Sequence, residues 1–155
     1  MTTSPERTRP RTAWAAFMPI FFRSTPHRFL RALRRRATVP FEEVVITGRI
    51  SGTERGVMLT IAESGGRLYV SHPDGARTHW VENLRVRPDV VIVRVSGERA
   101  PYRAVPLHEG PERTAAVERL IAVQRPPVNV VYRAARRHIH AEAQVFRLDP
   151  ASADA

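Results

Sequence analysis

From residue 41 onward, apolar and polar positions alternate in short stretches with the period of a β-strand. The stretch at 90–95 is mostly apolar instead, which predicts a strand buried on both faces. Ser64-Gly65-Gly66 reads as a tight turn that joins the second and third strands into a hairpin. In chain order, the strands are expected at 44–47, 57–61, 67–71, 90–95, 102–107 and 143–148.

Helical spacing appears between these strands. Thr78 precedes a short helix over 79–86 that ends at Pro88, and Pro111 starts a helix that reaches about residue 123. A further short helix is expected over 130–137. Short strands mostly joined by hairpins, with helices between them, predict an α+β fold: an antiparallel β-barrel of about six strands with peripheral helices.

The first 38 residues follow a different pattern. Trp14 to Phe22 is an apolar patch, and Ser24-Thr25-Pro26 starts a helix to about Ala37 with apolar residues on one face and arginines on the other. The predicted organisation is therefore a basic amphipathic helical arm (1–38), a barrel domain (39–150) and a disordered tail (151–155).

Charge separates these regions. The net charge is +10, and all 25 basic residues are arginine. Residues 1–38 contain nine arginines and one acid, a net charge of +8, whereas residues 39–155 carry only +2. The basic character therefore belongs mainly to the arm.

Three interpretations of the arm stay open. Its arginines and aromatic side chains at 13–37 suit an anionic membrane surface. It could equally pack on the barrel with a solvated basic face. Nucleic acid is a less favoured partner, because the arm contains no recognisable reading module.

The composition excludes several kinds of site. With no cysteine, the chain has no disulfide, thiolate metal site or cysteine nucleophile. The longest apolar run, 13–22, is too short to span a membrane and lacks a following cleavage site. We expect a cytoplasmic protein, or one peripheral on the inner face of the cell membrane.

The loop after the first predicted strand has the chemistry of a phosphate clamp. Gly48 and Gly52 let backbone N–H groups approach an anion closely. Arg49 and Arg55 add forked, charged donors, and Ser51 adds a hydroxyl. A plain turn with solvated arginines is the alternative.

Two segments carry a resemblance to a known family. Residues 47–55 (TGRISGTER) resemble the T-G-R-K-S-G-x-x-R stretch of deazaflavin-dependent nitroreductases, members of the FMN-binding split-barrel superfamily. Residues 79–88 (HWVENLRVRP) are similar to the family's W-x-x-N-L-x-x-N-P helix. Order and spacing agree over about 41–150, so the resemblance implies a split antiparallel β-barrel.

The resemblance also implies a coenzyme, the deazaflavin F-420, with FMN as the alternative. Arg49, Ser51, Gly52 and Arg55 would then hold its phosphate. Ser71 would lie near its ring, and Trp80 and Asn83 would hold the neighbouring loop and the coenzyme. By their positions in the sequence, His72 and His79 could line the same pocket, and a surface histidine is the favoured alternative for each.

Two positions depart from the family pattern. Ile50 replaces a lysine, which removes one anion contact. The tyrosine-bearing segment that closes the family's substrate pocket aligns near 125–133, where Tyr132 is the single tyrosine. Ser71 and Tyr132 are the candidate proton donors.

We predict no metal site. His138 and His140 would share one face of a strand, but no third ligand is evident nearby. Glu42 and Glu43 are adjacent and would face opposite ways on a strand, which makes them a poor acid–base pair.

Two functional hypotheses follow. The first is a reductase that transfers a hydride from the reduced deazaflavin to a small electrophilic acceptor: a quinone, a nitroaromatic or an activated alkene. The second is a flavin- or deazaflavin-binding barrel without turnover, docked at a membrane. Monomer and homodimer both stay open.

Overall fold

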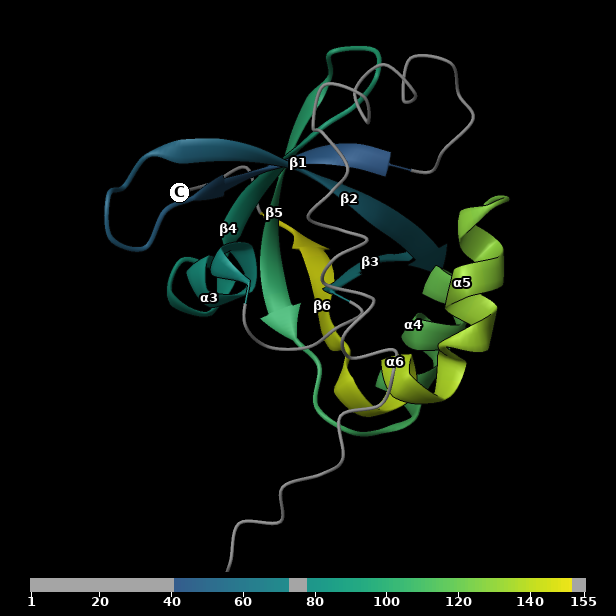
Figure 1. The fold of residues 1–155 in the computed structure, drawn as a ribbon. Coiled ribbons are helices and arrows are strands. Elements are labelled where there is room, and N and C mark those ends of the chain that lie inside the picture. Colours follow the sequence, from purple (N-terminus) through teal and green to yellow (C-terminus); the bar gives the residue numbers. More distant parts are fainter. Residues whose placement is uncertain (1–40, 73–77, 152–155) are drawn as a thin grey trace, which may run out of the picture.

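A six-stranded antiparallel barrel forms the centre of the molecule in the computed structural model, which describes residues 41–72 and 78–151 (Figure 1). The strands are β1 (Phe41–Thr47), β2 (Glu54–Ser64), β3 (Arg67–His72), β4 (Asp89–Val93), β5 (Arg99–Pro106) and β6 (Gln144–Pro150). The barrel closes in the order β1-β2-β3-β6-β5-β4. This confirms the predicted α+β barrel, while the predicted arm and tail lie outside the described residues, Ala151 apart.

Hairpins build most of this sheet. The β2–β3 hairpin pairs Ile61 with Val70, and the β4–β5 hairpin pairs Val91 with Pro101. The closing strand β6 lies between β3 and β5, where Val70 faces Phe146 and Ala104 faces Leu148. The chain therefore returns at its end to complete the barrel.

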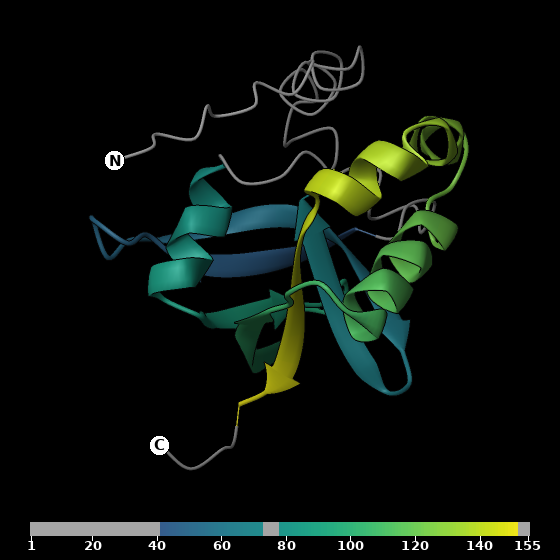
Figure 2. The same ribbon diagram turned by 90° about the horizontal axis from the view of Figure 1, so that it is seen from below.

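In the described part of the chain, four helices cover two regions of the barrel: α3 (His79–Val86), α4 (Pro111–Ala122), α5 (Val128–Ala134) and α6 (Arg136–Glu142). Helix α3 packs near β1, whereas α4 packs on β2, β3 and β6 and carries α5 and α6. Figures 1 and 2 place α3 on one side of the barrel and the α4–α6 layer on the other.

Strand alternation divides the apolar side chains between two cores. The barrel interior holds Val44, Ile92, Phe146 and their neighbours, together with Val81 and Leu84 of α3. The second core lies between the outer face of β2, β3 and β6 and the helices α4–α6, and contains Tyr69, Val117 and Ile139. Strands β2, β3 and β6 therefore bury one face in each core.

Two predicted elements are wrong in detail. Strand β4 ends at Val93, its residues alternate between buried and less buried, and Val95 beyond it is 61% exposed. The short helix expected at 130–137 is two helices, α5 and α6, so His138 and His140 lie on a helix rather than a strand. Apolar content alone did not show that one face of β4 stays near the barrel surface.

Candidate functional site

The loop between β1 and β2 is closed by its own hydrogen bonds. Gly48 N–H donates to the Thr53 carbonyl (2.9 Å), Gly52 N–H donates to the Gly48 carbonyl (2.9 Å), and Thr53 N–H donates to Ser51 Oγ (3.2 Å). Gly52 has φ +66°, a conformation that favours glycine. A Cβ at Gly48 would lie 2.8 Å from Ser51 Oγ, so a side chain there would displace the Ser51 hydroxyl.

Arg49 joins this loop to helix α3. Its backbone N–H and its Nη1 both donate to Asn83 Oδ1 at 3.1 Å, and its Nη2 lies 2.7 Å from Glu82 Oε2. The Arg49 side chain is only 28% exposed. Charge-assisted bonds of this kind hold a guanidinium in one orientation, and the loop is thereby held against the helix.

Other donors of the same region are without acceptors in the described part of the chain. They are the N–H groups of Ile50 and Ser51 and the exposed guanidinium of Arg55. Arg55 pairs with Ile46 across the β1–β2 ladder, so it shares the face of Ile46, which packs in the barrel interior with α3. Successive N–H groups beside an arginine fork make a concave site for an oxyanion.

Aromatic side chains continue the site beyond α3. The rings of His72 and Trp80 lie 5.9 Å apart, and those of Trp80 and Phe146 lie 6.1 Å apart. Phe146 is buried in the barrel interior, so this row of rings rests on the core. We call the 48–53 loop with Arg55, His72, Trp80, Glu82 and Asn83 the loop–helix cluster.

One buried polar atom borders the cluster. Thr78 precedes α3 but makes no side-chain cap, and its Oγ1 is buried without a hydrogen-bond partner in the described structure. Unsatisfied buried hydroxyls are costly. A polar ligand group beside α3 would satisfy this one.

Ser71 and His72 are adjacent on β3 and therefore point to opposite faces. His72 contacts Trp80, whereas Ser71 shares the face of Tyr69, which packs in the second core. His79 is exposed at the start of α3. Of these three predicted residues, His72 is the one with a ring contact inside the cluster.

Tyr132 lies elsewhere. It is 6% exposed on α5 and packs in the second core with Tyr69 and Ile139. Burial raises the pKa of its hydroxyl well above the ordinary value, so it stays protonated at neutral pH. The structure does not bring Tyr132 to the loop–helix cluster, and its role as proton donor stays a prediction.

Glu82 is the residue of the loop–helix cluster that the sequence analysis did not single out. It occupies a variable position of the helix motif, beside Asn83, and its role depends on a contact with a loop more than 30 residues earlier. An acid in the first turn of α3, next to a matched asparagine, is a signal that could have suggested it.

No group of three or more histidine, aspartate or glutamate side chains is placed to hold a metal ion in residues 41–72 and 78–151. Within the same ranges, no helix has the length and apolar character that a membrane crossing needs.

Solved structures share this fold. An F420-H2 dependent reductase is 23% identical, with a TM-score of 0.55 over 71% of this chain and 94% of its own. A putative 5-nitroimidazole antibiotic resistance protein from Bacteroides thetaiotaomicron is 12% identical, with a TM-score of 0.53 over 81% and 80%. The heme storage protein HutZ from Vibrio cholerae is 12% identical, with a TM-score of 0.51 over 79% and 88%. At these identities the likeness establishes the fold alone.

Sequence comparison gives the family. Curated proteins provided no match to the chain. The family described as F420H(2)-dependent quinone reductase matches residues 32–140, which include every residue of the loop–helix cluster. The chain therefore belongs to the F420H2-dependent quinone reductase family, and it is an oxidoreductase that uses coenzyme F420.

Proposed function

We propose that the loop–helix cluster holds the phosphodiester of reduced F420 and that the protein directs hydride transfer to a quinone or another small electrophilic acceptor. The observation that carries the proposal is a short segment with several unused donors, the Ile50 and Ser51 N–H groups and Arg55, on a loop that Arg49 ties to α3. These donors fit an anionic phosphate better than a neutral ligand.

Arg49 and Arg55 have different tasks in this arrangement. Arg49 is paired with Glu82 and Asn83, so it mainly fixes the loop and adds positive potential. Arg55 has no acceptor in the described residues and is available to bind the phosphate directly. Ser51 Oγ already accepts from Thr53 N–H and can still donate its own proton to an oxyanion.

The ring-binding part of the site lies beside Trp80 and His72. Their rings provide apolar area and ring nitrogens. Thr78, whose buried hydroxyl has no partner among the described residues, comes two residues before Trp80. When bound, the coenzyme supplies the hydride, and the protein supplies orientation and exclusion of water. The sequence suggests Ser71 or Tyr132 as the proton donor for the reduced acceptor, but both lie on the side of the second core. Solvent is therefore the donor that this geometry favours.

The acceptor is proposed from the family description, which makes a quinone the first compound to test. Nitroaromatics and activated alkenes are the other candidates, because they accept a hydride by the same chemistry. Attachment of residues 13–37 to an anionic membrane would place the protein beside lipid-soluble quinones. Co-sedimentation with anionic and neutral vesicles tests this, and equal binding to both would contradict an electrostatic attachment.

The deciding experiment is a titration of the purified full chain with F420 and, in parallel, FMN, followed by tryptophan fluorescence. Arg55→Ala should weaken F420 binding by about tenfold or more, since it removes charge-assisted bonds to the phosphate. Arg99→Ala removes an exposed arginine from β5 and is the matched control. Equal affinity of wild type and Arg55→Ala would contradict the phosphate assignment.

Turnover separates the two functional hypotheses. Reduced F420 should be oxidised at steady state when menadione is added, with loss of activity in Arg55→Ala recovered at high coenzyme concentration. Tight binding without turnover across quinones, nitroaromatics and activated alkenes would leave the hydride-acceptor proposal without support.

A further inference from the structure

A pocket lies among helices α4, α5 and α6, the layer that Figures 1 and 2 place on the side of the barrel away from α3. Helices α4, α5 and α6 line an open pocket of about 620 Å³. Small-molecule sites usually have volumes of about 300–1,000 Å³. The size therefore suits a small organic ligand, and none of the loop–helix cluster lines it.

The lining of this pocket is strongly basic. Three arginines, Arg133, Arg136 and Arg137, and the histidine His140 lie around a single acid, Glu118. With His140 neutral, these side chains sum to a net charge of +2. A concave surface of one charge sign concentrates ligands of the other sign.

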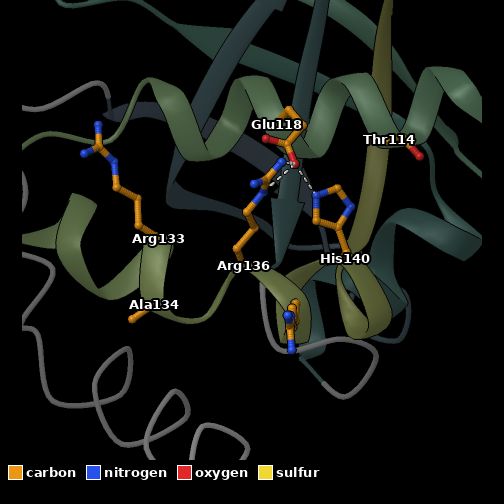
Figure 3. A pocket seen from close by; sticks show the side chains of 7 residues that line it. Thr114, Glu118, Arg133, Ala134, Arg136 and His140 are labelled. Atoms are coloured by element: carbon orange, nitrogen blue, oxygen red, sulfur yellow. Dashed lines mark hydrogen bonds and ion pairs between the residues drawn. The ribbon is translucent and has the colours of Figure 1, made fainter.

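Glu118 is already occupied by two of these groups. Arg136 donates from Nε to Glu118 Oε1 at 2.8 Å, and His140 Nε2 forms a short contact with the same oxygen. Figure 3 shows both side chains directed at Glu118 from α6, below α4. Glu118, the one carboxylate in the lining of the pocket, is thus held by side chains of α6.

Arg133 and Arg137 are different. Both are exposed, and neither has a hydrogen-bond or ion-pair acceptor in the described part of the chain. Arg133 extends from α5, away from the Arg136–Glu118–His140 group (Figure 3). Guanidinium forks of this kind bind carboxylates and phosphates in bidentate geometry.

We propose that this pocket is a binding site for a small polyanion with at least two carboxylate or phosphate groups. One anionic group would pair with Arg133 on α5 and the other with Arg137 on α6. Thr114 provides a hydroxyl donor at the pocket edge on α4. The proposal stands apart from the coenzyme site and does not rest on it.

Calorimetric titration of the full chain tests the proposal, with citrate as the carboxylate probe and inorganic pyrophosphate as the phosphate probe, at constant ionic strength. The double variant Arg133→Gln/Arg137→Gln should lose about tenfold or more in affinity for the preferred anion. The matched control is Arg94→Gln/Arg99→Gln, which removes the same charge around the β4–β5 hairpin and should bind like wild type.

A second variant works in the opposite direction. Glu118→Gln removes the carboxylate that competes for Arg136, so anion affinity should rise roughly two- to fivefold. This gain does not depend on the folding of the double variant. F420 binding, measured in the same samples, should stay unchanged in every variant.

Three results would overturn the proposal. One is the absence of saturable binding tighter than roughly 10 mM for either anion. Another is an equal loss in the double variant and in its control, which would indicate charge without a site. The last is unchanged affinity in both the double variant and Glu118→Gln.

Discussion

Asn83 has two bonds to one neighbour. Its Oδ1 accepts from both the backbone and the side chain of Arg49, at 3.1 Å each. The resemblance to a known helix motif singled out Asn83 as a residue near the coenzyme. The structure shows a more direct task, because this one oxygen fixes both the path of the loop and the direction of its arginine.

Substitutions at Asn83 should separate loop stability from coenzyme binding. Asn83→Ala leaves two Arg49 donors unpaired and should lower the free energy of unfolding by about 1–3 kcal/mol. Asn83→Asp keeps an acceptor for Arg49, so it should be more stable than Asn83→Ala. It also adds a negative charge beside the proposed phosphate site and should weaken F420 binding.

Chemical denaturation and coenzyme titration together check this prediction. Asn129, half-buried on α5, offers a matched Asn→Ala control outside the loop–helix cluster. Asn83→Asp that binds F420 as well as wild type would argue against a phosphate near this end of α3.

At the scale of elements, the α4–α6 contact depends on charge as well as on apolar packing. Glu118 on α4 accepts from Arg136 and His140 on α6. Arg113 of α4 donates to the carbonyls of His140 and Ala143 at 2.8 Å each, which satisfies the end of α6. Helices α4 and α6 are too short to be stable on their own, and these contacts and the second core hold them in place.

The Glu118 contact should make stability depend on acidity. Burial raises the pKa of the Glu118 carboxyl, but the bonds from Arg136 and His140 outweigh it and leave the pKa below its ordinary value of 4.5. A lowered pKa in the folded state contributes stability above the unfolded pKa, and this contribution is lost as pH falls through the folded value. Wild type should therefore lose stability as pH falls below about 4.5.

Glu118→Gln should flatten this acid limb while lowering stability at pH 7. Thermal melting at several pH values between about 3 and 7 measures this change in the pH dependence of stability. Glu109→Gln, at an exposed acid outside these contacts, is the control; the same flattening in both variants would remove Glu118 as the cause.

For the whole molecule, the barrel interior connects the fold to the site. Phe146 on the closing strand is 1% exposed, packs in the first core and contacts Trp80 of the loop–helix cluster. The closing strand thus supports the Trp80 ring of the proposed coenzyme site.

Phe146→Ala should cost about 3–5 kcal/mol of unfolding free energy, because it removes a fully buried ring and leaves a cavity. F420 binding should also weaken, since Trp80 loses its support. Denaturant unfolding followed by circular dichroism measures the first effect. The surface change Val130→Ser, at a residue 66% exposed, should be nearly neutral, and a comparable loss there would contradict the core argument.

The sequence alone determined the strands and most of the helices, and it predicted the clamp chemistry of residues 48–55. These depend on local information: alternation, glycines at turns, and donor types placed close together in the chain. It could not determine that Arg49 pairs with Glu82, or that Ser71 and His72 separate onto opposite sides of a closed sheet. It also put His138 and His140 on a strand.

Those features are properties of contacts between distant residues. Closure between β3 and β6 decides which face of each strand is interior, and the packing of α4 on that sheet decides that Tyr132 is buried. The pocket between α4, α5 and α6 arises in the same way, because its arginines are unremarkable until three helices bring them around Glu118. Local pattern determined the elements, and long-range packing determined which side chains share a site.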